Sequence, residues 1–328
     1  MSSCEPPTAD ATPHVTVVVV VYAQARFVEQ CLDSVRAQTC RPRLVVVDDA
    51  SPDDSADVVR RWAERTGFPV ELVAHAENRG LGASLAEALD LVTTPFLAYI
   101  AGDDWMEPER VEVQHRAMEE AGDRCALSYS DVHRADESGV RLHPTFAQQH
   151  AADWGSREPD VYAALLRRNW IPAPSTMLRT SALRSVGGYD PEIFYEDHDV
   201  ALRIARRYEV LALESCLATH RELTGSYGHR MFFTDAQRSA WLRARVLIYR
   251  KHLGHDESTD AVIVPMLLAW LRELYLRGEP VAWVRARYAE VRRAGPRPGT
   301  GGKVLALSRL GVPGRLVTSA SSVLTGRR

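Results

Sequence analysis

Three pairs of adjacent acidic residues are the feature of this sequence most able to do chemistry. Asp48–Asp49 ends a run of valines, Asp103–Asp104 ends a later apolar run, and Glu196–Asp197 opens a helix-like stretch farther along the chain. Carboxylates that converge in a fold repel one another and raise each other's pKa unless a cation or a polar ligand lies among them. Three such pairs in one chain therefore point to a site for a metal ion and a polyhydroxylated, phosphorylated substrate.

The segments that carry the first two pairs predict a parallel sheet. Val15–Val21 is an unbroken β-branched run, which is typical of a strand buried on both faces. Further strands are expected at Leu44–Val47, Val70–Val73 and Phe96–Ile100, with helices between them. This alternation predicts a doubly wound, mostly parallel α/β sheet flanked by helices. Ligands bind such sheets at the carboxyl ends of the strands, where the first two acidic pairs are expected.

Each acidic pair also has a purely structural interpretation. An Asp after a strand is often a turn former or a helix N-cap. The segment Ser51–Asp54 predicts its own N-cap at Ser51, a proline at the first helical position and an acidic capping-box partner. This leaves Asp49 for a ligand. The acids of Glu196–Asp197 could simply lie in the first turn of a helix, where the macrodipole favours negative charge.

Several other enzyme classes do not fit the sequence. The segment Gly80–Gly82 precedes a predicted helix, but the third glycine of a dinucleotide-binding loop is missing and the preceding strand is the third one. The sequence has no Walker A motif, no HExxH motif and no paired Cys/His set. Tyr22–Ala25 offers no Gly-rich phosphate loop for a sugar nucleotidyltransferase.

Composition sets broad limits. With 328 residues, 45% of them hydrophobic and 25% charged, the chain is long enough for one large α/β domain and an extension. A net charge of −3 gives no support for a nucleic-acid partner. The five cysteines are scattered, as in reduced cytosolic proteins, and the sequence shows neither a signal peptide nor a membrane span. We therefore expect a cytoplasmic protein.

The motifs, taken in order, resemble those of glycosyltransferase family 2 on a GT-A fold. The resemblance spans residues 14 to about 228. Its motifs are the first strand with Tyr22, then Leu32–Thr39, Val47–Asp53, Asn78–Gly80, Gly102–Asp104, Gly187–Asp190 and Glu196–Arg203. The resemblance implies an inverting glycosyltransferase that transfers a sugar from a nucleotide diphosphate sugar, with UDP- or dTDP-sugars favoured. The alternative is a GT-A-like domain that binds a nucleotide or a partner without catalysing transfer, because Ala101 stands where the family often has another carboxylate.

The resemblance also implies roles for individual residues. Asp104 and Asp103 would hold Mg²⁺ or Mn²⁺, and Asp197 would be the general base with Glu196 orienting it. The remaining predicted contacts to the nucleotide sugar are Tyr22, Asp49, Asn78, Gly80, Asp103 and Arg221. Asp199 is expected to be structural, and Arg203 is expected to be an ion-pair partner within the same helix.

The rest of the chain is predicted to be an extension of the catalytic domain. We expect a flexible N-terminus at 1–13, a GT-A catalytic domain at 14–228, a helical extension at 229–293 and a basic tail at 294–328. The sequence does not identify the acceptor, which could be a glycan, a lipid-linked molecule, a peptide or a small molecule, nor the oligomeric state. The tail is a candidate for peripheral contact with the inner face of the cell membrane, the alternative being a solvated or self-packed tail.

Overall fold

The computed structural model describes residues 13–150, 160–223 and 235–294, together with 305, 307–311, 313 and 314. The chain divides into two compact units, residues 1–224 and residues 225–328. Most of the predicted basic tail, residues 295–304 and 315–328, lies outside the described residues.

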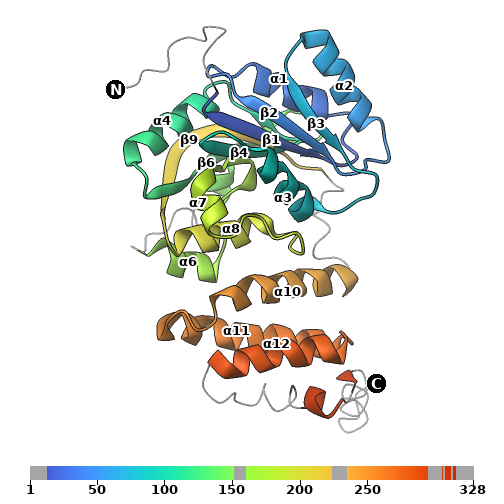
Figure 1. Cartoon of the computed structure of the whole chain (residues 1–328), viewed down its shortest axis with the longest axis vertical. Coiled ribbons are helices and arrows are strands. Elements are labelled where there is room, and N and C mark those ends of the chain that lie inside the picture. The colour runs from blue at the N-terminus through green and yellow to red at the C-terminus, as the bar shows by residue number, and fades with distance from the viewer. Residues whose placement is uncertain are drawn as a thin grey trace. The chain divides into compact units, whose positions relative to one another are not determined.

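The first half of the large unit is a parallel sheet. Strands β1 (Val15–Val21), β2 (Arg43–Asp48), β3 (Val70–Ala74) and β4 (Phe96–Ala101) are all parallel and lie in the order β3-β2-β1-β4 (Figure 1). The chain winds outward from β1 to β3 and then returns to place β4 on the other side of β1. This switch in strand order lies between β1 and β4, the position where such sheets bind ligands.

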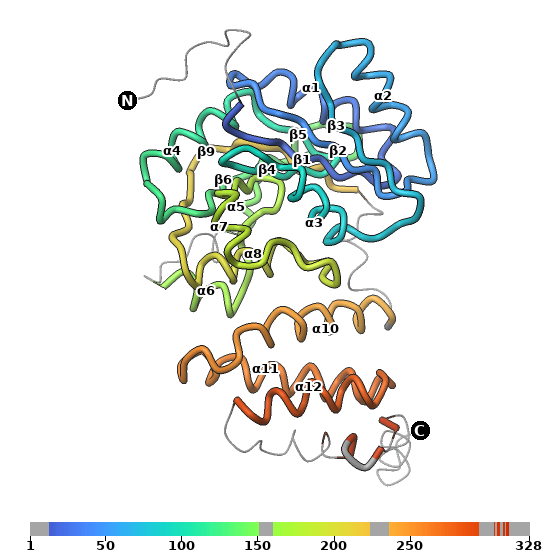
Figure 2. Tube along the Cα trace, in the orientation of Figure 1, coloured from blue at the N-terminus to red at the C-terminus, as the bar shows by residue number. Residues whose placement is uncertain are grey.

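The second half of the sheet is mixed. Its strands are β5 (Trp105–Met106), β6 (Cys125–Ala135), β7 (Arg141–Leu142), β8 (Met177–Arg179) and β9 (Glu209–Arg221). Strand β8 joins β4 and β6 by antiparallel pairing, and β9 runs parallel to β6. Figure 2 shows β9 beside β6. Within the described residues, one nine-stranded sheet thus continues from β3 to β5, with β7 paired to β6. The predicted doubly wound, mostly parallel α/β fold is confirmed.

Helices cover both faces of the sheet (Figure 1). Helices α1 (Val28–Arg36), α2 (Ser55–Thr66) and α4 (Arg110–Ala121) pack on one face, against Val17 and Val19 of β1. Helices α3 (Leu81–Leu91), α7 (Thr180–Ser185) and α8 (Glu196–Ala205) lie on the other face. The short elements α5 (Phe146–Gln149), α6 (Val161–Arg167) and η1 (Ala173–Ser175) complete the described part of this unit. Every residue of β1 is buried, as its unbroken apolar sequence predicts.

The predicted cap at Ser51 was wrong. Helix α2 begins only at Ser55, and the Ser51 hydroxyl accepts a hydrogen bond from the Ala23 amide at 3.1 Å. The Ser55 hydroxyl similarly accepts from the Gln24 amide at 3.0 Å. These side chains satisfy the backbone of the loop after β1 instead of a helix end. The loops after β1 and β2 are therefore fixed to each other.

The small unit is helical, as expected. It contains α10 (Asp235–Tyr249), η2 (Arg250–His252), α11 (Glu257–Leu276), α12 (Val281–Ala294) and η3 (Leu307–Leu310). Helix α11 begins at Glu257 because Asp256 caps it, its carboxylate accepting from the Thr259 amide at 2.7 Å. None of the helices in the described residues is long and apolar enough to span a membrane.

Candidate active site

The Asp49 carboxylate lies at the carboxyl edge of the sheet and is held by three donors. Its Oδ1 accepts from the Arg79 amide at 2.8 Å and lies 2.8 Å from Nδ1 of His75, while its Oδ2 accepts from the Gly80 amide at 2.8 Å. The Asn78 side chain donates to the Asp49 carbonyl at 3.2 Å. Three residues predicted for the nucleotide site, Asp49, Asn78 and Gly80, are therefore in direct contact.

Tyr22 directly follows β1, close to this carboxylate. The Asp49 amide donates to the Val21 carbonyl at 2.9 Å, which brings the ends of β1 and β2 together. The Tyr22 side chain is a large hydrophobic side chain that is nevertheless exposed, at 49%. Ala23 and Ala50, the residues that follow Tyr22 and Asp49, both have left-handed backbone angles, with φ of 55° and 57°. Strained non-glycine backbone of this kind is concentrated at functional sites.

The Asp104 carboxylate is held by the end of β9. Its Oδ1 accepts from the Arg221 amide at 2.8 Å and lies 3.1 Å from Nδ1 of His220. The carboxylate is only 4% exposed, whereas the His220 side chain is 40% exposed. The structure thus joins the predicted metal ligand to two residues from the far end of the domain.

The charges at this point are strongly coupled. Burial and then the neighbouring Asp104 charge raise the pKa of Asp103 to about 7. Burial alone would lower the pKa of His220, but the charge and hydrogen bond of Asp104 outweigh it and raise this pKa to about 9. Protonated His220 is therefore a cation beside the acidic pair near neutral pH, and sequence reasoning gave it no role.

Arg221, predicted to contact the nucleotide sugar, has internal partners. Its guanidinium lies 4.7 Å from the centre of the Phe27 ring and 4.8 Å from that of Trp105. It donates from Nε to the Asp103 carbonyl at 3.0 Å and from Nη2 to Gln30 at 2.6 Å. Because the residue is 2% exposed, these contacts fix the backbone beneath both acids.

The Glu196–Asp197 pair opens α8 on the other side of the site. Burial raises the pKa of Asp197 to about 6, although hydrogen bonds from the His198 amide and from Asn169 act to lower it. The Asn169 amide nitrogen donates to Asp197 Oδ2 at 3.2 Å. Burial and the Asp197 charge raise the pKa of Glu196 well above its usual range. With a pKa of about 6, Asp197 is ionised at neutral pH.

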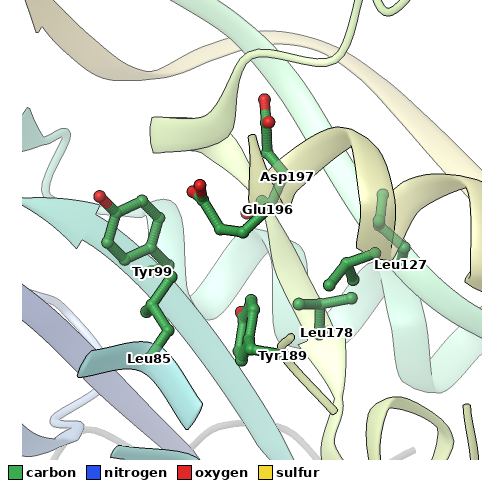
Figure 3. Close-up of a pocket in the computed structure, with 9 residues that line it drawn as sticks. Leu85, Tyr99, Leu127, Leu178, Tyr189, Glu196 and Asp197 are labelled. Carbon is green, nitrogen blue, oxygen red and sulfur yellow. The ribbon is translucent and has the colours of Figure 1, made fainter. Parts of the chain in front are cut away.

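A small cavity of about 20 Å³, room for one water-sized group, adjoins these acids. Its lining consists of Leu85, Tyr99, Leu127, Thr176, Leu178, Tyr189, Glu196, Asp197 and Val200. Figure 3 shows the Glu196 carboxyl group pointing toward Tyr99, whereas Asp197 points away from Leu127 and Leu178. Burial, followed by the charges of Glu196, Asp104 and Asp103, raises the pKa of Tyr99 well above its usual range. Tyr99 is therefore within electrostatic reach of both acidic pairs.

Close packing positions α3 and α8. A side chain at Gly82 of α3 would place its Cβ 2.5 Å from the Ile193 carbonyl and 2.6 Å from the Asp190 carbonyl, so only glycine fits. The Asp199 carboxylate, 1% exposed, pairs with Arg203 at 2.5 Å, and Arg203 also donates to the Val186 and Gly188 carbonyls at 2.7 Å. The Asp199–Arg203 pair thus attaches α8 to the turn at Val186 and Gly188.

Sequence reasoning missed three polar residues near the site. His75 and Asn169 contact the two acids expected to act on the nucleobase and the acceptor, and Arg110 is fully buried beneath β4, where its Nη2 donates to the Tyr99 carbonyl at 3.2 Å. Burial lowers the pKa of Arg110 to about 9. Each of these contacts joins separate elements. The sequence carries only one signal for them, the general rule that a buried charge has a hydrogen-bond or ion-pair partner.

Comparison with known proteins identifies the family. The family model described as glycosyl transferase family 2 matches residues 16–180, half of the chain. The chain belongs to glycosyl transferase family 2. EpsH of Bacillus subtilis is 33% identical to it over 141 residues, which are 42% of the chain and 40% of EpsH. The family 2 chain thus spans two fifths of the length of that relative.

Solved structures share the fold of this family 2 protein. The S. aureus TarS 1-349 complex with UDP has a TM-score of 0.58 at 15% identity, covering 85% of this chain and 87% of TarS 1-349. The mannosyltransferase PcManGT from Pyrobaculum calidifontis, in complex with GDP-Man and Mn²⁺, has a TM-score of 0.53 at 22% identity, covering 98% and 90%. These matches confirm the expected GT-A type of fold.

Proposed function

We propose that this family 2 protein is an inverting glycosyltransferase. It transfers a sugar from a nucleotide diphosphate sugar, with UDP- or dTDP-sugars favoured, to an acceptor hydroxyl. The observation that carries the proposal is the arrangement of two acidic pairs around Tyr99, one at the end of β4 and one at the start of α8. Such a site can hold a diphosphate on one side and remove a proton on the other.

The two carboxylates at the end of β4 could hold a divalent metal together with the substrate phosphates. Among the described residues, no three His, Cys, Asp or Glu side chains form a group that could hold a metal on their own. Mg²⁺ in phosphate-transferring and related sites is typically bound by one or two carboxylates with the substrate phosphates completing its shell. Asp104 and Asp103 would hold Mg²⁺ or Mn²⁺ in this way. When bound, the metal neutralises the charge of the leaving diphosphate.

The protein groups would then divide the remaining work. Asp49 would accept an N–H of the nucleobase, beside the exposed ring of Tyr22 and the loop that carries Asn78 and Gly80. Arg221 acts on the donor site indirectly, by holding the backbone of Asp103 and the carboxylate of Asp104. This proposed role is indirect, whereas the motif predicts a contact between Arg221 and the nucleotide sugar.

Asp197 is proposed as the general base. With a pKa of about 6 it is ionised near neutral pH and can take the proton of the acceptor hydroxyl as that hydroxyl attacks the anomeric carbon. Glu196, the residue next to Asp197, would orient this base. Displacement by direct attack inverts the anomeric configuration.

Two experiments test this function. A thermal-shift panel of UDP-, dTDP- and GDP-sugars with Mn²⁺ should show selective stabilisation by one nucleotide class. Asp197→Asn should keep donor binding and lose transfer by on the order of 10²- to 10⁴-fold. NMR of the product anomer then checks inversion. Turnover by Asp197→Asn within a few-fold of the unmodified protein would move the base elsewhere, with Glu196 the next candidate.

The non-catalytic alternative has only one observation in its favour. Ala101 supplies no third carboxylate, but Asp103 and Asp104 lie together and Asp197, the proposed base, is present. We therefore favour an active enzyme. For the chain as a whole we propose a catalytic domain at 14–228, a helical extension at 229–293 and a basic tail at 294–328 that contacts anionic lipid at the inner face of the membrane.

A further inference from the structure

His75 links two carboxylates behind the proposed nucleobase site. It follows β3, its amide donates to the Asp48 carbonyl at 2.9 Å, and its side chain is only 4% exposed. Its Nδ1 lies 2.8 Å from Asp49 Oδ1, and its Nε2 lies 3.2 Å from Glu87 Oε2. Glu87, on α3, also pairs with the Arg79 guanidinium. An imidazole donates at both positions only when both ring nitrogens carry protons.

The donors around Asp49 leave one acceptor position open. A carboxylate offers about four such positions, two on each oxygen. Oδ1 receives the Arg79 amide and faces His75, and Oδ2 receives the Gly80 amide. The remaining position belongs to Oδ2. Turning the carboxylate would disturb all three contacts, so this network fixes which oxygen is left for a ligand.

An ionised carboxylate oxygen only accepts hydrogen bonds, so it discriminates among nucleobases. Uracil, thymine and guanine each present a ring N–H on the Watson–Crick edge, whereas the corresponding ring nitrogen of cytosine or adenine is an acceptor and is repelled. We propose that His75, supported by Glu87, is a positioning residue that keeps Asp49 in the orientation that enforces this choice. The proposal rests on the proposed function, in which Asp49 faces the base.

The same contacts could serve only to attach α3 to the end of β3. The Arg79–Glu87 ion pair already connects the loop to the helix, and it lies nearer the surface, with side chains 47% and 35% exposed. A purely structural His75 would change stability without changing the relative affinity for different bases. Base discrimination therefore separates the two roles.

The test measures UDP and CDP affinity by calorimetry in Mn²⁺ with the full chain. The unmodified protein should bind UDP at least tenfold more tightly than CDP. His75→Leu, which removes the donor, should lose about tenfold in UDP affinity and little in CDP affinity. His75→Asn has nearly the same shape as leucine, and its amide nitrogen can replace Nδ1, so it should retain discrimination. Arg79→Gln is the matched control, because it breaks the ion pair but keeps the main-chain amide on Asp49.

Each result decides the proposal. An unchanged ratio of UDP to CDP affinity in a folded His75→Leu protein, or loss of the ratio in Arg79→Gln as well, would overturn it. If His75→Leu does not unfold cooperatively, His75→Met gives the same comparison, since it fills a similar volume and offers no donor. Failure of the unmodified protein to bind UDP, dTDP or GDP would instead contradict the proposed function. Binding of UDP without any preference over CDP would refute the role of His75 alone.

Discussion

Removal of the Asn169 side chain should move the acid limb of the pH–rate profile to higher pH. Its amide donates to Asp197 Oδ2 at 3.2 Å and acts to lower the pKa of the proposed base. A hydrogen bond to a charged group is worth roughly 1.5–3 kcal/mol, and each pKa unit corresponds to about 1.4 kcal/mol. Because this bond is long, we take the low end of that range, about one unit. In Asn169→Ala the pKa of Asp197 should therefore rise from about 6 to about 7.

The direction of this shift in the pH–rate profile follows from the role of Asp197 as a base. Asp197 works only when deprotonated, so the rate is low below its pKa and reaches a plateau above it. At pH 6 the unmodified enzyme should have about half its plateau rate and Asn169→Ala about a tenth, a loss of about fivefold that disappears above pH 8.

The assay is kcat/KM from pH 5 to 9 in saturating Mn²⁺, measured as transfer or, before the acceptor is known, as slow hydrolysis of the donor. Asn169→Asp is an informative companion, because it keeps the acceptor for the Ile171 amide but places a second carboxylate beside Asp197. Asn169→Asp should move the acid limb of the pH–rate profile at least as far as Asn169→Ala does. An acid limb that stays at the same pH in folded Asn169→Ala would refute the reasoning.

Three further predictions concern the metal, the fold and the tail. Asp104→Ala should abolish metal-dependent nucleotide binding, since the diphosphate would meet the remaining acids without its cation; unchanged calorimetric affinity in Mn²⁺ would remove Asp104 from the metal site. Arg203→Met should lower the free energy of unfolding in urea by about 3–5 kcal/mol, because it leaves the buried Asp199 charge unpaired, and a loss below about 1 kcal/mol would contradict the role of this pair. The full chain should sediment with anionic liposomes in a salt-sensitive way, whereas a protein ending at residue 290 should not; no sedimentation of the full chain at low salt would end the membrane proposal.

The sequence predicted the elements whose pattern is local. The strands β1 to β4 and the helices between them follow from apolar runs and periodic stripes, and Val15–Val21 needed no tertiary information. The start of α2 was missed because the Ser51 hydroxyl binds the loop after β1, a choice made by the tertiary fold. Strand β9 was not predicted, since its shifts in register against β6 break the alternation of buried and exposed residues.

The candidate site also contains residues that the sequence predicted and residues that it did not. Motif order located Asp49, Asp104 and Asp197, and Asp49 indeed contacts the segment Asn78–Gly80. The partners that set the charge and orientation of these acids could not be inferred, because each comes from a distant segment. His220 has no local pattern that connects it with Asp104. For Arg221, a residue type that suits phosphate turned out to pack between two aromatic rings.

The bond between Asp104 and the end of β9 has a consequence for how the protein is made. Asp104 and its partners His220 and Arg221 are separated by 116 and 117 positions in the chain. Contacts of such long range form slowly, because the intervening loop must be closed before they contribute. During synthesis, β1 to β4 can pair while β9 is still unmade, so the nucleobase side is complete first. We therefore expect the Asp103–Asp104 turn of a nascent chain to be exposed to proteolysis until residue 221 has left the ribosome. A shortened chain that ends before β9 should stay exposed at this turn, because it lacks His220 and Arg221.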